Sequence, residues 1–455
     1  MTDFKKFNLL SPIQKALDAI GFNTPTPIQA KSIPVIFTGA DLIGSAQTGT
    51  GKTGAFCIPM LTFLINNPNK NALILVPTRE LALQIEEFWH GLTQFCKEIR
   101  CVTLIGGISM DPQMRGIKKN PRLVIATPGR LVDHLQRGSL NLSQVGILIL
   151  DEADRMLDMG FAPQLNEIVR VVPKNRQTLF FTATWDQKTD LLSKKFLRGT
   201  VERVAVGETS KAANTVTQSL YSTTQDGKRD LLLEELNSKE GTILVFARTQ
   251  HRTDRVARYL SSYGVEVNRI HGGRSQGQRT TALREFKEGK IRVLVATDIA
   301  ARGIDVAEIA HVINFDLPQV AEDYIHRIGR TGRAGATGTA TSFVTSEDMD
   351  LWKEIVKLLK KTGSTVPTAK QAKQTRAPNA DDQNPEEPLI APLKAKPTRS
   401  HPQNRRENQW APQTVNLKPV HEQRFKPSHT SARPVARTTT DGKSLFVTRA
   451  PAKQS

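Results

Sequence analysis

The sequence has few cysteines and no long apolar run. Its three cysteines, Cys57, Cys96 and Cys101, lack the spacing of a metal site. So few thiols favour a reducing, cytoplasmic environment in which they are packed instead of paired in disulfides. No stretch approaches the about 18 consecutive apolar residues that a membrane span needs, and the first residues, 1–6, do not resemble a signal peptide. We therefore expect a cytoplasmic protein without a membrane-spanning segment.

Positive charge is in excess: the formal net charge is +19 and the pI is about 9.9. Such a balance favours a polyanionic partner, with nucleic acid as the first candidate and a membrane surface as the second. Residues 361–455 hold 17 Lys or Arg against 7 Asp or Glu, and 12 of the 25 prolines. With only three aromatic residues, this segment cannot bury enough apolar surface to offset its ordering entropy. We expect a disordered basic tail that binds nucleic acid without sequence selectivity, or one that only aids solubility.

Short apolar runs alternate with amphipathic segments in two successive series. Near-continuous apolar runs are typical of parallel strands that are covered by helices on both faces. Strand–helix alternation in two series predicts an α/β fold with two doubly wound parallel-sheet domains. The predicted strands are 72–76, 102–105, 123–126, 145–150 and 178–181 in the first series, and 242–246, 265–270, 293–296, 311–315 and 339–344 in the second.

Composition also suggests where the domains end. A stretch rich in Gly, Ser, Thr, Ala and Asn near 205–218 separates the two series and predicts a hinge. The expected organisation is an N-terminal region at 1–30, a first domain at 31–205, a linker at 206–218, a second domain at 219–362 and the tail at 363–455.

A glycine-rich loop follows the apolar pair Leu42-Ile43 and precedes a helical pattern. The backbone N–H groups of such a loop converge on phosphate oxygens at a helix N-terminus. Lys52 would reach the β- and γ-phosphates, and the Thr53 hydroxyl would bind Mg²⁺. Taken alone, the loop could also be an ordinary glycine-rich turn. The residues expected to surround the phosphates are Ala46, Gln47, Thr48, Gly49, Thr50, Gly51, Lys52 and Thr53.

Acidic residues end a strongly apolar run, Ile147 to Leu150. Asp151 and Glu152 would therefore lie at the carboxyl edge of a sheet, where open α/β folds bind ligands. Asp151 suits Mg²⁺, which prefers oxygen ligands, and Glu152 suits orienting or deprotonating an attacking water. Read in isolation, the same residues could be the acidic start of a helix.

An arginine-rich segment, His326 to Arg333, lies far from both motifs. Phosphoryl transfer needs a phosphate cradle, a carboxylate for the metal, a group that orients water and an arginine that neutralises the transition state. All four kinds of part are present, but they are too far apart in sequence for one domain. The chemistry is therefore predicted to depend on two domains meeting.

The Asp-Glu-Ala-Asp sequence at 151–154 resembles the signature of the DEAD-box RNA helicases. The resemblance implies two tandem RecA-like domains and extends over residues 4–360. Gly21 to Gln29 resembles the adenine-sensing Q motif, in which Gln29 reads the base through its amide donor and acceptor. Phe4 matches an aromatic residue that stacks on the base, although a packing role at the first helix is equally open.

The remaining motifs receive their roles from the same resemblance. Arg330 and Arg333 would contact the γ-phosphate, His326 would connect this motif to the acidic cluster, and Asp305 would bind the ribose. Thr182 and Thr184, in a Thr-Ala-Thr sequence where the family more often has Ser-Ala-Thr, would couple the ATP and RNA sites together with Asp154. The implied RNA contacts are Pro77, Thr78, Arg79, Gly107, Thr127, Arg130, Phe246, Gln276, Arg279, Thr297 and Arg302.

The resemblance implies an ATP-dependent RNA helicase that uses ATP and Mg²⁺ and is most like the bacterial RhlE group. It implies local, poorly processive unwinding of structured RNA with little sequence preference, or remodelling of RNA–protein complexes. RNA-decay proteins are possible partners, the core is expected to be monomeric, and no membrane partner is expected. An ATP-gated RNA clamp with little unwinding stays open, because it would share every motif. The Q motif and Asp154 disfavour a DNA translocase, and the intact motifs disfavour a catalytically inactive binding protein.

Overall fold

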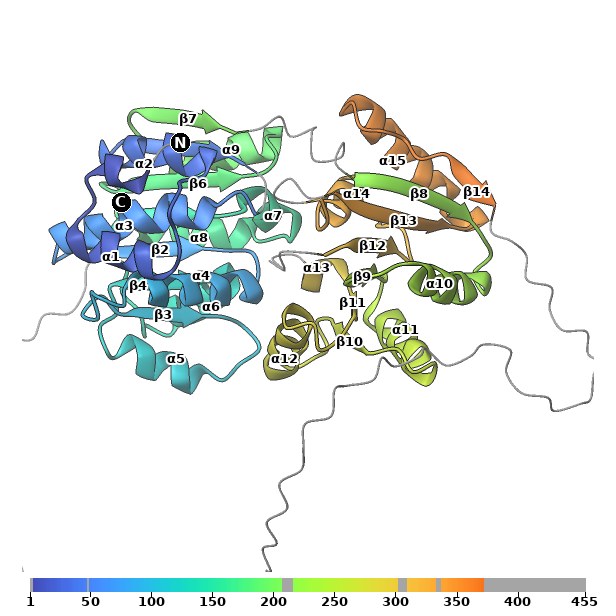
Figure 1. Cartoon of the computed structure of the whole chain (residues 1–455). Coiled ribbons are helices and arrows are strands. Elements are labelled where there is room, and N and C mark those ends of the chain that lie inside the picture. The colour runs from blue at the N-terminus through green and yellow to red at the C-terminus, as the bar shows by residue number, and fades with distance from the viewer. Residues whose placement is uncertain (1–2, 47–48, 207–215, 302–308, 333–336, 372–455) are drawn as a thin grey trace, which may run out of the picture. The chain divides into compact units, whose positions relative to one another are not determined.

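The computed structural model describes residues 3–46, 49–206, 216–301, 309–332 and 337–371, which form two parallel sheets flanked by helices (Figure 1). The first sheet has the strand order β3-β4-β2-β5-β6-β1-β7, and the second has the order β10-β11-β9-β12-β13-β8-β14. Both sheets are therefore seven-stranded and doubly wound, which confirms the predicted fold class.

Five strands of the first sheet agree with the predicted apolar runs to within one residue at each end, whereas β1 and β7 had no predicted run. Its members are β1 (Asp41–Ser45), β2 (Asn71–Leu75), β3 (Cys101–Leu104), β4 (Leu123–Ala126), β5 (Val145–Leu150), β6 (Gln177–Thr182) and β7 (Val201–Ala205). The second sheet consists of β8 (Val216–Ser222), β9 (Ile243–Phe246), β10 (Val267–Ile270), β11 (Val293–Ala296), β12 (His311–Asn314), β13 (Gly338–Val344) and β14 (Ala369–Gln371).

Helices connect the strands and cover the sheets. Around the first sheet lie a 3-10 helix, η1 (Phe4–Phe7), and α1 (Ser11–Ala19), α2 (Pro27–Phe37), α3 (Lys52–Asn66), α4 (Arg79–Leu92), α5 (Met110–Ile117), α6 (Pro128–Gln136), α7 (Ala153–Asp158), α8 (Ala162–Val171) and α9 (Gln187–Phe196). Around the second lie α10 (Gly227–Ser238), α11 (Gln250–Ser262), α12 (Gln276–Lys287), α13 (Asp298–Ala301), α14 (Ala321–Ile328), η3 (Ser346–Asp348) and α15 (Met349–Lys361).

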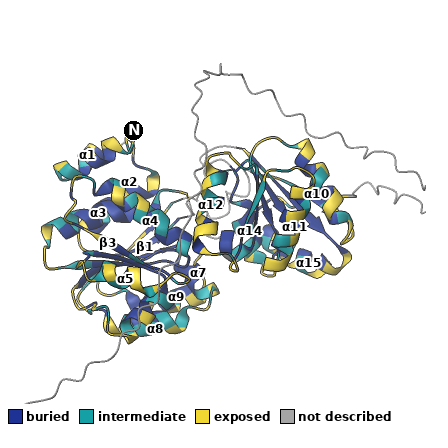
Figure 2. Ribbon diagram, turned by 90° about the horizontal axis from the view of Figure 1, so that it is seen from below, coloured by how far each residue is buried: buried dark blue, intermediate teal, exposed yellow. Residues whose placement is uncertain are grey.

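Both faces of the first sheet are buried. In β5, Ile147 and Ile149 belong to one apolar cluster, whereas Leu148 and Leu150 belong to another on the opposite face. Figure 2 shows the consequence: the central strands are buried, and the exposed residues lie mainly on the outer faces of the helices. The near-continuous apolar character of these strands therefore reflects helices on both sides of the sheet.

Side-chain caps set the start of several helices. Thr78, Asp186, Thr249 and Ser275 each accept a hydrogen bond from the backbone N–H three residues further on. Such a cap satisfies one of the four N–H groups that have no partner within the helix. The caps of α4 and α12 set the start of two helices whose first residues were predicted to contact RNA.

The domain boundaries differ from the predicted ones at two places. The linker was predicted to reach residue 218, but β8 already begins at Val216 and pairs with β13. The tail was predicted to begin at 363, yet β14 pairs with β8 and Ser364 is buried. Both segments are rich in polar residues, so composition alone did not mark them as strands. The tail beyond 371 lies outside the described residues.

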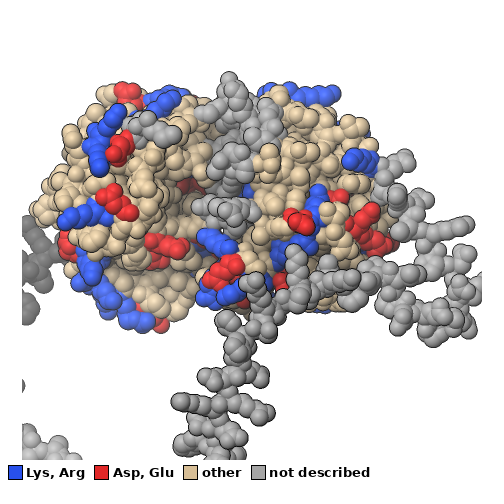
Figure 3. Space-filling view, in the orientation of Figure 1, with Lys and Arg blue, Asp and Glu red and all other residues tan. Residues whose placement is uncertain are grey.

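Within the part of the chain that the structure describes, no helix combines the length and the apolar character needed to cross a membrane. Figure 3 shows basic and acidic side chains interspersed on the face in view. Residues 1–371 contain 48 Lys or Arg and 37 Asp or Glu, so the charge excess is not confined to the tail.

Candidate active site

The phosphate loop lies between β1 and α3. Gly51 precedes α3 with φ of 94°, and Gly49 has φ of 83°, so both occupy the left-handed region that glycine adopts without strain. A Cβ atom at Gly51 would lie 2.7 Å from the Gln29 amide nitrogen. This position therefore needs glycine for its conformation and for the close approach of Gln29. Gln47 and Thr48 lie outside the described residues.

Lys52 directly follows this loop, and its side chain faces Asp151. The Lys52 ammonium lies 3.5 Å from Asp151 Oδ1, and both side chains are buried. Burial raises the pKa of Asp151, and the charge of Lys52 partly opposes this effect. Within the described residues, the Lys52 ammonium makes no hydrogen bond. A buried ammonium without a hydrogen bond is costly, so its environment suits an anionic ligand such as a phosphate.

Glu152 has an unusual backbone conformation. Its φ is 53° and its ψ is 51°, which is the left-handed region that few residues other than glycine adopt. The side chain is buried, and its Oε2 lies 3.6 Å from Arg155 Nη1. Backbone strain of this kind costs about 1–3 kcal/mol and is concentrated at functional sites. The conformation turns the chain sharply between strand β5 and helix α7.

Asp154 connects the acidic cluster to the segment after β6. Its Oδ2 accepts hydrogen bonds from the Ala183 N–H at 3.1 Å, the Thr184 N–H at 2.7 Å and the Thr184 hydroxyl at 2.8 Å. The Thr182 hydroxyl in turn donates to the Thr184 carbonyl at 2.6 Å. The three residues predicted to couple the two sites are thus in one hydrogen-bond network, although the coupling itself stays a prediction.

Gln29 contacts the phosphate loop directly. Its Oε1 accepts a hydrogen bond from the Thr26 N–H at 2.9 Å, and its Nε2 donates to the Gly51 carbonyl at 3.0 Å. Phe4 is fully buried, with its ring centroid 6.0 Å from Phe7 and 6.3 Å from Phe22. The packing role of Phe4 is therefore visible in the structure, and its stacking on a base stays a prediction.

The predicted RNA contacts of the first domain follow β2, β3 and β4. Because parallel strands end at one edge of a sheet, these segments share an edge with the phosphate loop and Asp151. Arg79 lies so close to Gly107 that an added Cβ would clash with the guanidinium, and φ at Gly107 is 74°. Arg130 donates two hydrogen bonds to the Ile108 carbonyl, at 3.0 and 3.1 Å. Pro77, Thr78 and Thr127 lie at the turns into α4 and α6.

The second domain places its predicted residues on several elements. Phe246 ends β9, Thr297 follows β11, and Gln276 and Arg279 lie in the first turn of α12. His326 lies in the last turn of α14, and Arg330 follows that helix and is buried. Three further predicted residues, Arg302, Asp305 and Arg333, lie outside the described residues.

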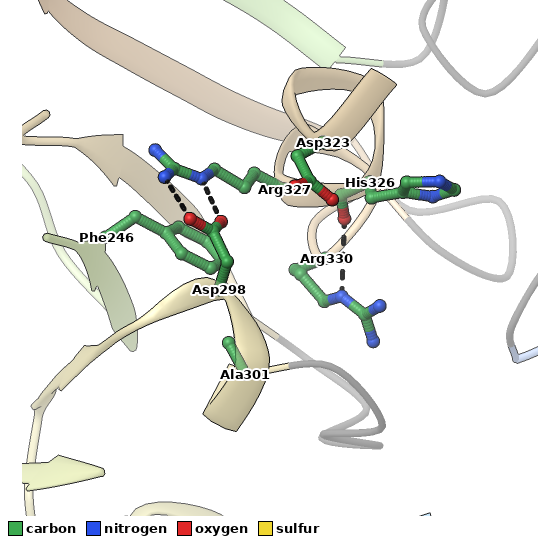
Figure 4. A pocket seen from close by; sticks show the side chains of 7 residues that line it. All are labelled: Phe246, Asp298, Ala301, Asp323, His326, Arg327 and Arg330. Atoms are coloured by element: carbon green, nitrogen blue, oxygen red, sulfur yellow. Dashed lines mark hydrogen bonds and ion pairs between the residues drawn. The ribbon is translucent and has the colours of Figure 1, made fainter. Parts of the chain in front are cut away.

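Arg327 is a functional candidate that the sequence analysis did not single out. Its guanidinium binds both carboxylate oxygens of Asp298, at 2.5 and 2.6 Å, and lies 4.8 Å from the ring centroid of Phe246. It also donates to Asn314 Oδ1 and to the Asp316 carbonyl. Figure 4 shows Arg327, Asp298 and Phe246 around a small cavity of about 10 Å³ that His326 and Arg330 also line.

The contacts of Arg327 join the ends of β9, β11 and β12 to α14. This guanidinium therefore fixes the helix that leads into Arg330. Phe246 is buried beneath it, so the observed role of Phe246 is support, and its contact with RNA stays a prediction. The sequence signal for Arg327 was its position three residues before Arg330. Three arginines within eight residues do not indicate which of them points into the domain.

Comparison with known proteins agrees with this geometry. Residues 26–192 match the family described as DEAD/DEAH box helicase, and residues 227–335 match the helicase conserved C-terminal domain. ATP-dependent RNA helicase CshA of Listeria monocytogenes is 42% identical over 363 residues, which cover 79% of this chain and 69% of that protein. DEAD-box ATP-dependent RNA helicase CshA of Geobacillus kaustophilus is 42% identical over 351 residues, which cover 77% and 75%. Mss116p, solved bound to ssRNA and AMP-PNP, superimposes with a TM-score of 0.74 at 30% identity and covers 81% of this chain and 78% of that chain.

Two RecA-like domains, with a phosphate loop and an acidic cluster at one sheet edge, define an ATP-dependent helicase of the two-domain type. The chain belongs to the DEAD-box ATP-dependent RNA helicases.

Proposed function

We propose that this helicase couples RNA-stimulated ATP hydrolysis to local, poorly processive separation of short RNA duplexes or to remodelling of RNA–protein complexes. The observation that carries the proposal is the buried Lys52 ammonium, which makes no hydrogen bond within the described residues and faces Asp151 beside the strained Glu152. This arrangement suits a bound triphosphate. The Asp154 network offers a physical connection from that site to residues 182–184.

Each part of the site has a proposed task. Lys52 binds the β- and γ-phosphates, and Glu152 orients the attacking water. A Mg²⁺ ion held by Thr53 and Asp151 would neutralise phosphate charge, and the buried Asp151 carboxylate suits an ion that prefers oxygen ligands. Arg330 and Arg333 stabilise charge on the γ-phosphate, because a guanidinium meets phosphate oxygens bidentately. His326 connects the arginine segment to the acidic cluster.

Energy sets the scale of unwinding. Separating one duplex step costs roughly 0.6–2.2 kcal/mol by analogy with DNA stacking. A hydrogen bond to a charged group contributes about 1.5–3 kcal/mol. A handful of new backbone contacts in an ATP-bound state can therefore destabilise a few base pairs but not a long helix. Backbone and 2′-OH contacts also explain a preference for RNA with little sequence selectivity.

Strand-release kinetics with a short and a much longer RNA duplex test the proposal. The full-length protein with ATP should release the short duplex far faster than the long one, and Lys52→Ala should release neither. RNA-stimulated ATP turnover is measured on the same samples. Equal release of both duplexes would contradict local unwinding. Long ATP-dependent dwell on RNA without release of the short duplex would instead support the clamp.

Three finer assignments rest on the resemblance alone. These are membership of the RhlE-like group, RNA-decay proteins as partners, and a monomeric core. Size measurements on the full-length protein with and without RNA test the last of these.

A further inference from the structure

Three side chains with metal-binding atoms meet at one edge of the first sheet. Glu86 and His90 lie on α4, and Cys101 is the first residue of the edge strand β3. A carboxylate oxygen, an imidazole nitrogen and the thiol sulfur all lie within 4.8 Å of one another. None of the three residues belongs to a motif that was assigned to ATP or RNA.

The fold explains why these residues converge. Glu86 and His90 are four residues apart on a helix, so their side chains share one face. Helix α4 packs against β3, which brings Cys101 to that face although it is eleven residues from His90 in sequence. Cysteine spacing alone could not reveal the cluster, because only one of its members is a cysteine.

The donor set is specific about the kind of metal. Imidazole and thiolate ligands suit Zn²⁺ and similar transition metals, whereas Mg²⁺ and Ca²⁺ prefer oxygen. Zinc bonds are about 2.3 Å to sulfur and about 2.0–2.2 Å to nitrogen or oxygen, so tetrahedral ligand atoms lie about 3.5 Å apart. The observed spacing is close enough for small side-chain rotations to reach this geometry.

The surroundings favour entry of an ion. His90 is exposed and Glu86 is partly exposed, whereas Cys101 packs against the apolar core. Among the described residues, none of the three side chains forms a hydrogen bond or an ion pair with a fourth residue. Burial, and then the nearby Glu86 carboxylate, raise the pKa of the Cys101 thiol to about 12. The thiol is therefore protonated before binding, and a divalent cation would have to displace this proton. The cation would then be held by the thiolate and the Glu86 carboxylate, and water could fill a fourth position on the exposed side.

We propose that Glu86, His90 and Cys101 form a binding site for a divalent transition-metal ion of the zinc class, which ties α4 to β3. The site is separate from the proposed magnesium site at Thr53 and Asp151. Its residues lie on the two elements that carry predicted RNA contacts at one end, because α4 begins at Arg79 and β3 leads to Gly107. The bound ion would stabilise the first domain.

Cobalt is the probe, because its absorption reports both geometry and a sulfur ligand. Co²⁺ added to the full-length protein should bind one equivalent, with a near-ultraviolet sulfur-to-cobalt charge-transfer band and visible bands of tetrahedral intensity. Cys101→Ser should abolish the charge-transfer band. His90→Ala and Glu86→Gln should weaken binding by at least about 10-fold.

Matched controls separate the site from neighbouring groups. Glu87→Gln removes the exposed carboxylate next to Glu86, and Cys96→Ser removes a thiol five residues before Cys101; both should bind Co²⁺ as the parent does. His90 is exposed, so His90→Ala should fold even if Cys101→Ser does not. Zn²⁺ should raise the thermal unfolding temperature of the parent but not of His90→Ala.

Two results would overturn the proposal. One is the absence of a charge-transfer band when the parent protein is titrated with Co²⁺. The other is a band of parental strength and affinity in folded Cys101→Ser or His90→Ala.

Discussion

Replacing Asp154 with asparagine tests whether this side chain transmits RNA binding to the ATP site. Both oxygens of the Asp154 carboxylate accept hydrogen bonds. Oδ2 accepts three from residues 183 and 184, and Oδ1 accepts one from the Arg155 N–H at 3.0 Å. An amide has nearly the same volume but only one acceptor oxygen. In either orientation of the asparagine amide, its NH₂ group faces donors and cannot accept their hydrogen bonds. The hydrogen bonds to one of the two former carboxylate oxygens are therefore lost.

The expected loss follows from the number of bonds. A hydrogen bond to a charged group contributes about 1.5–3 kcal/mol, against about 0.5–1.5 kcal/mol for a neutral pair. Three bonds to one oxygen that become neutral would lose roughly 3 kcal/mol in total. If half of this loss reaches the transition state, ATP turnover at saturating RNA falls about tenfold. ATP affinity should change little, because Asp154 binds residues 183 and 184 and not the phosphate loop.

The assay compares ATP turnover with and without single-stranded RNA, and nucleotide affinity in the absence of RNA. Thr184→Val removes the hydroxyl donor alone and should give an intermediate loss, whereas Thr184→Ser keeps all three donors and should resemble the parent. Asp158→Asn removes an exposed carboxylate from the same helix and serves as the charge control. Parental RNA stimulation in Asp154→Asn, or an equal loss in Asp158→Asn, would refute the reasoning.

Four further predictions concern other parts of the chain. Gln29→Ala should relax the preference for ATP over GTP in kcat/KM, and an unchanged ratio would argue against base reading by Gln29. Deleting residues 372–455 should weaken RNA affinity and flatten its dependence on salt, while ATP hydrolysis survives. The reason is the positive charge of this segment, which carries 15 Lys or Arg against 7 Asp or Glu. An unchanged salt dependence of RNA affinity would exclude an RNA-binding tail. Lys228→Ala leaves the buried carboxylates of Asp316 and Asp348 without their shared ammonium, although each keeps an arginine partner, so hydrogen exchange of the β9 and β12 amides should show a loss near the lower end of about 3–5 kcal/mol. Burial raises the pKa of Asp348, but Lys228, the Thr345 hydroxyl and Arg248 outweigh burial and hold this pKa below its usual range. The stabilisation from the ionised Asp348 should therefore persist above about pH 4 and decline on further acidification. A second domain whose stability does not change with acid would contradict this prediction.

The apolar runs predicted the central strands well. The predicted bounds of β4, β5 and β11 coincide with those observed, because these strands are buried on both faces and contain few polar residues. Strands β7 and β8 were not predicted. In β7 most side chains are exposed, and in β8 only Val216 and Leu220 are buried, so neither produces a continuous apolar run.

Motif order predicted the family, but not the contacts that hold the site in place. Arg327 could not be distinguished from Arg330 in the sequence, because its task depends on the ends of three strands that come together only in the fold. Likewise, the approach of Glu86 and His90 to Cys101 depends on how α4 packs against β3. Side-chain direction and packing between distant elements are tertiary properties, and one sequence without its fold does not specify them locally.

The left-handed conformation at Glu152 has a consequence for how its chemistry can be measured. A substitution there changes the carboxylate and the ease of the backbone turn together, so a slow Glu152→Val enzyme would mix two defects. Asparagine and glycine adopt this conformation with little penalty, and glutamine keeps the side-chain length. Comparing these three replacements would separate the contribution of the acidic group to turnover from that of the bend that presents it.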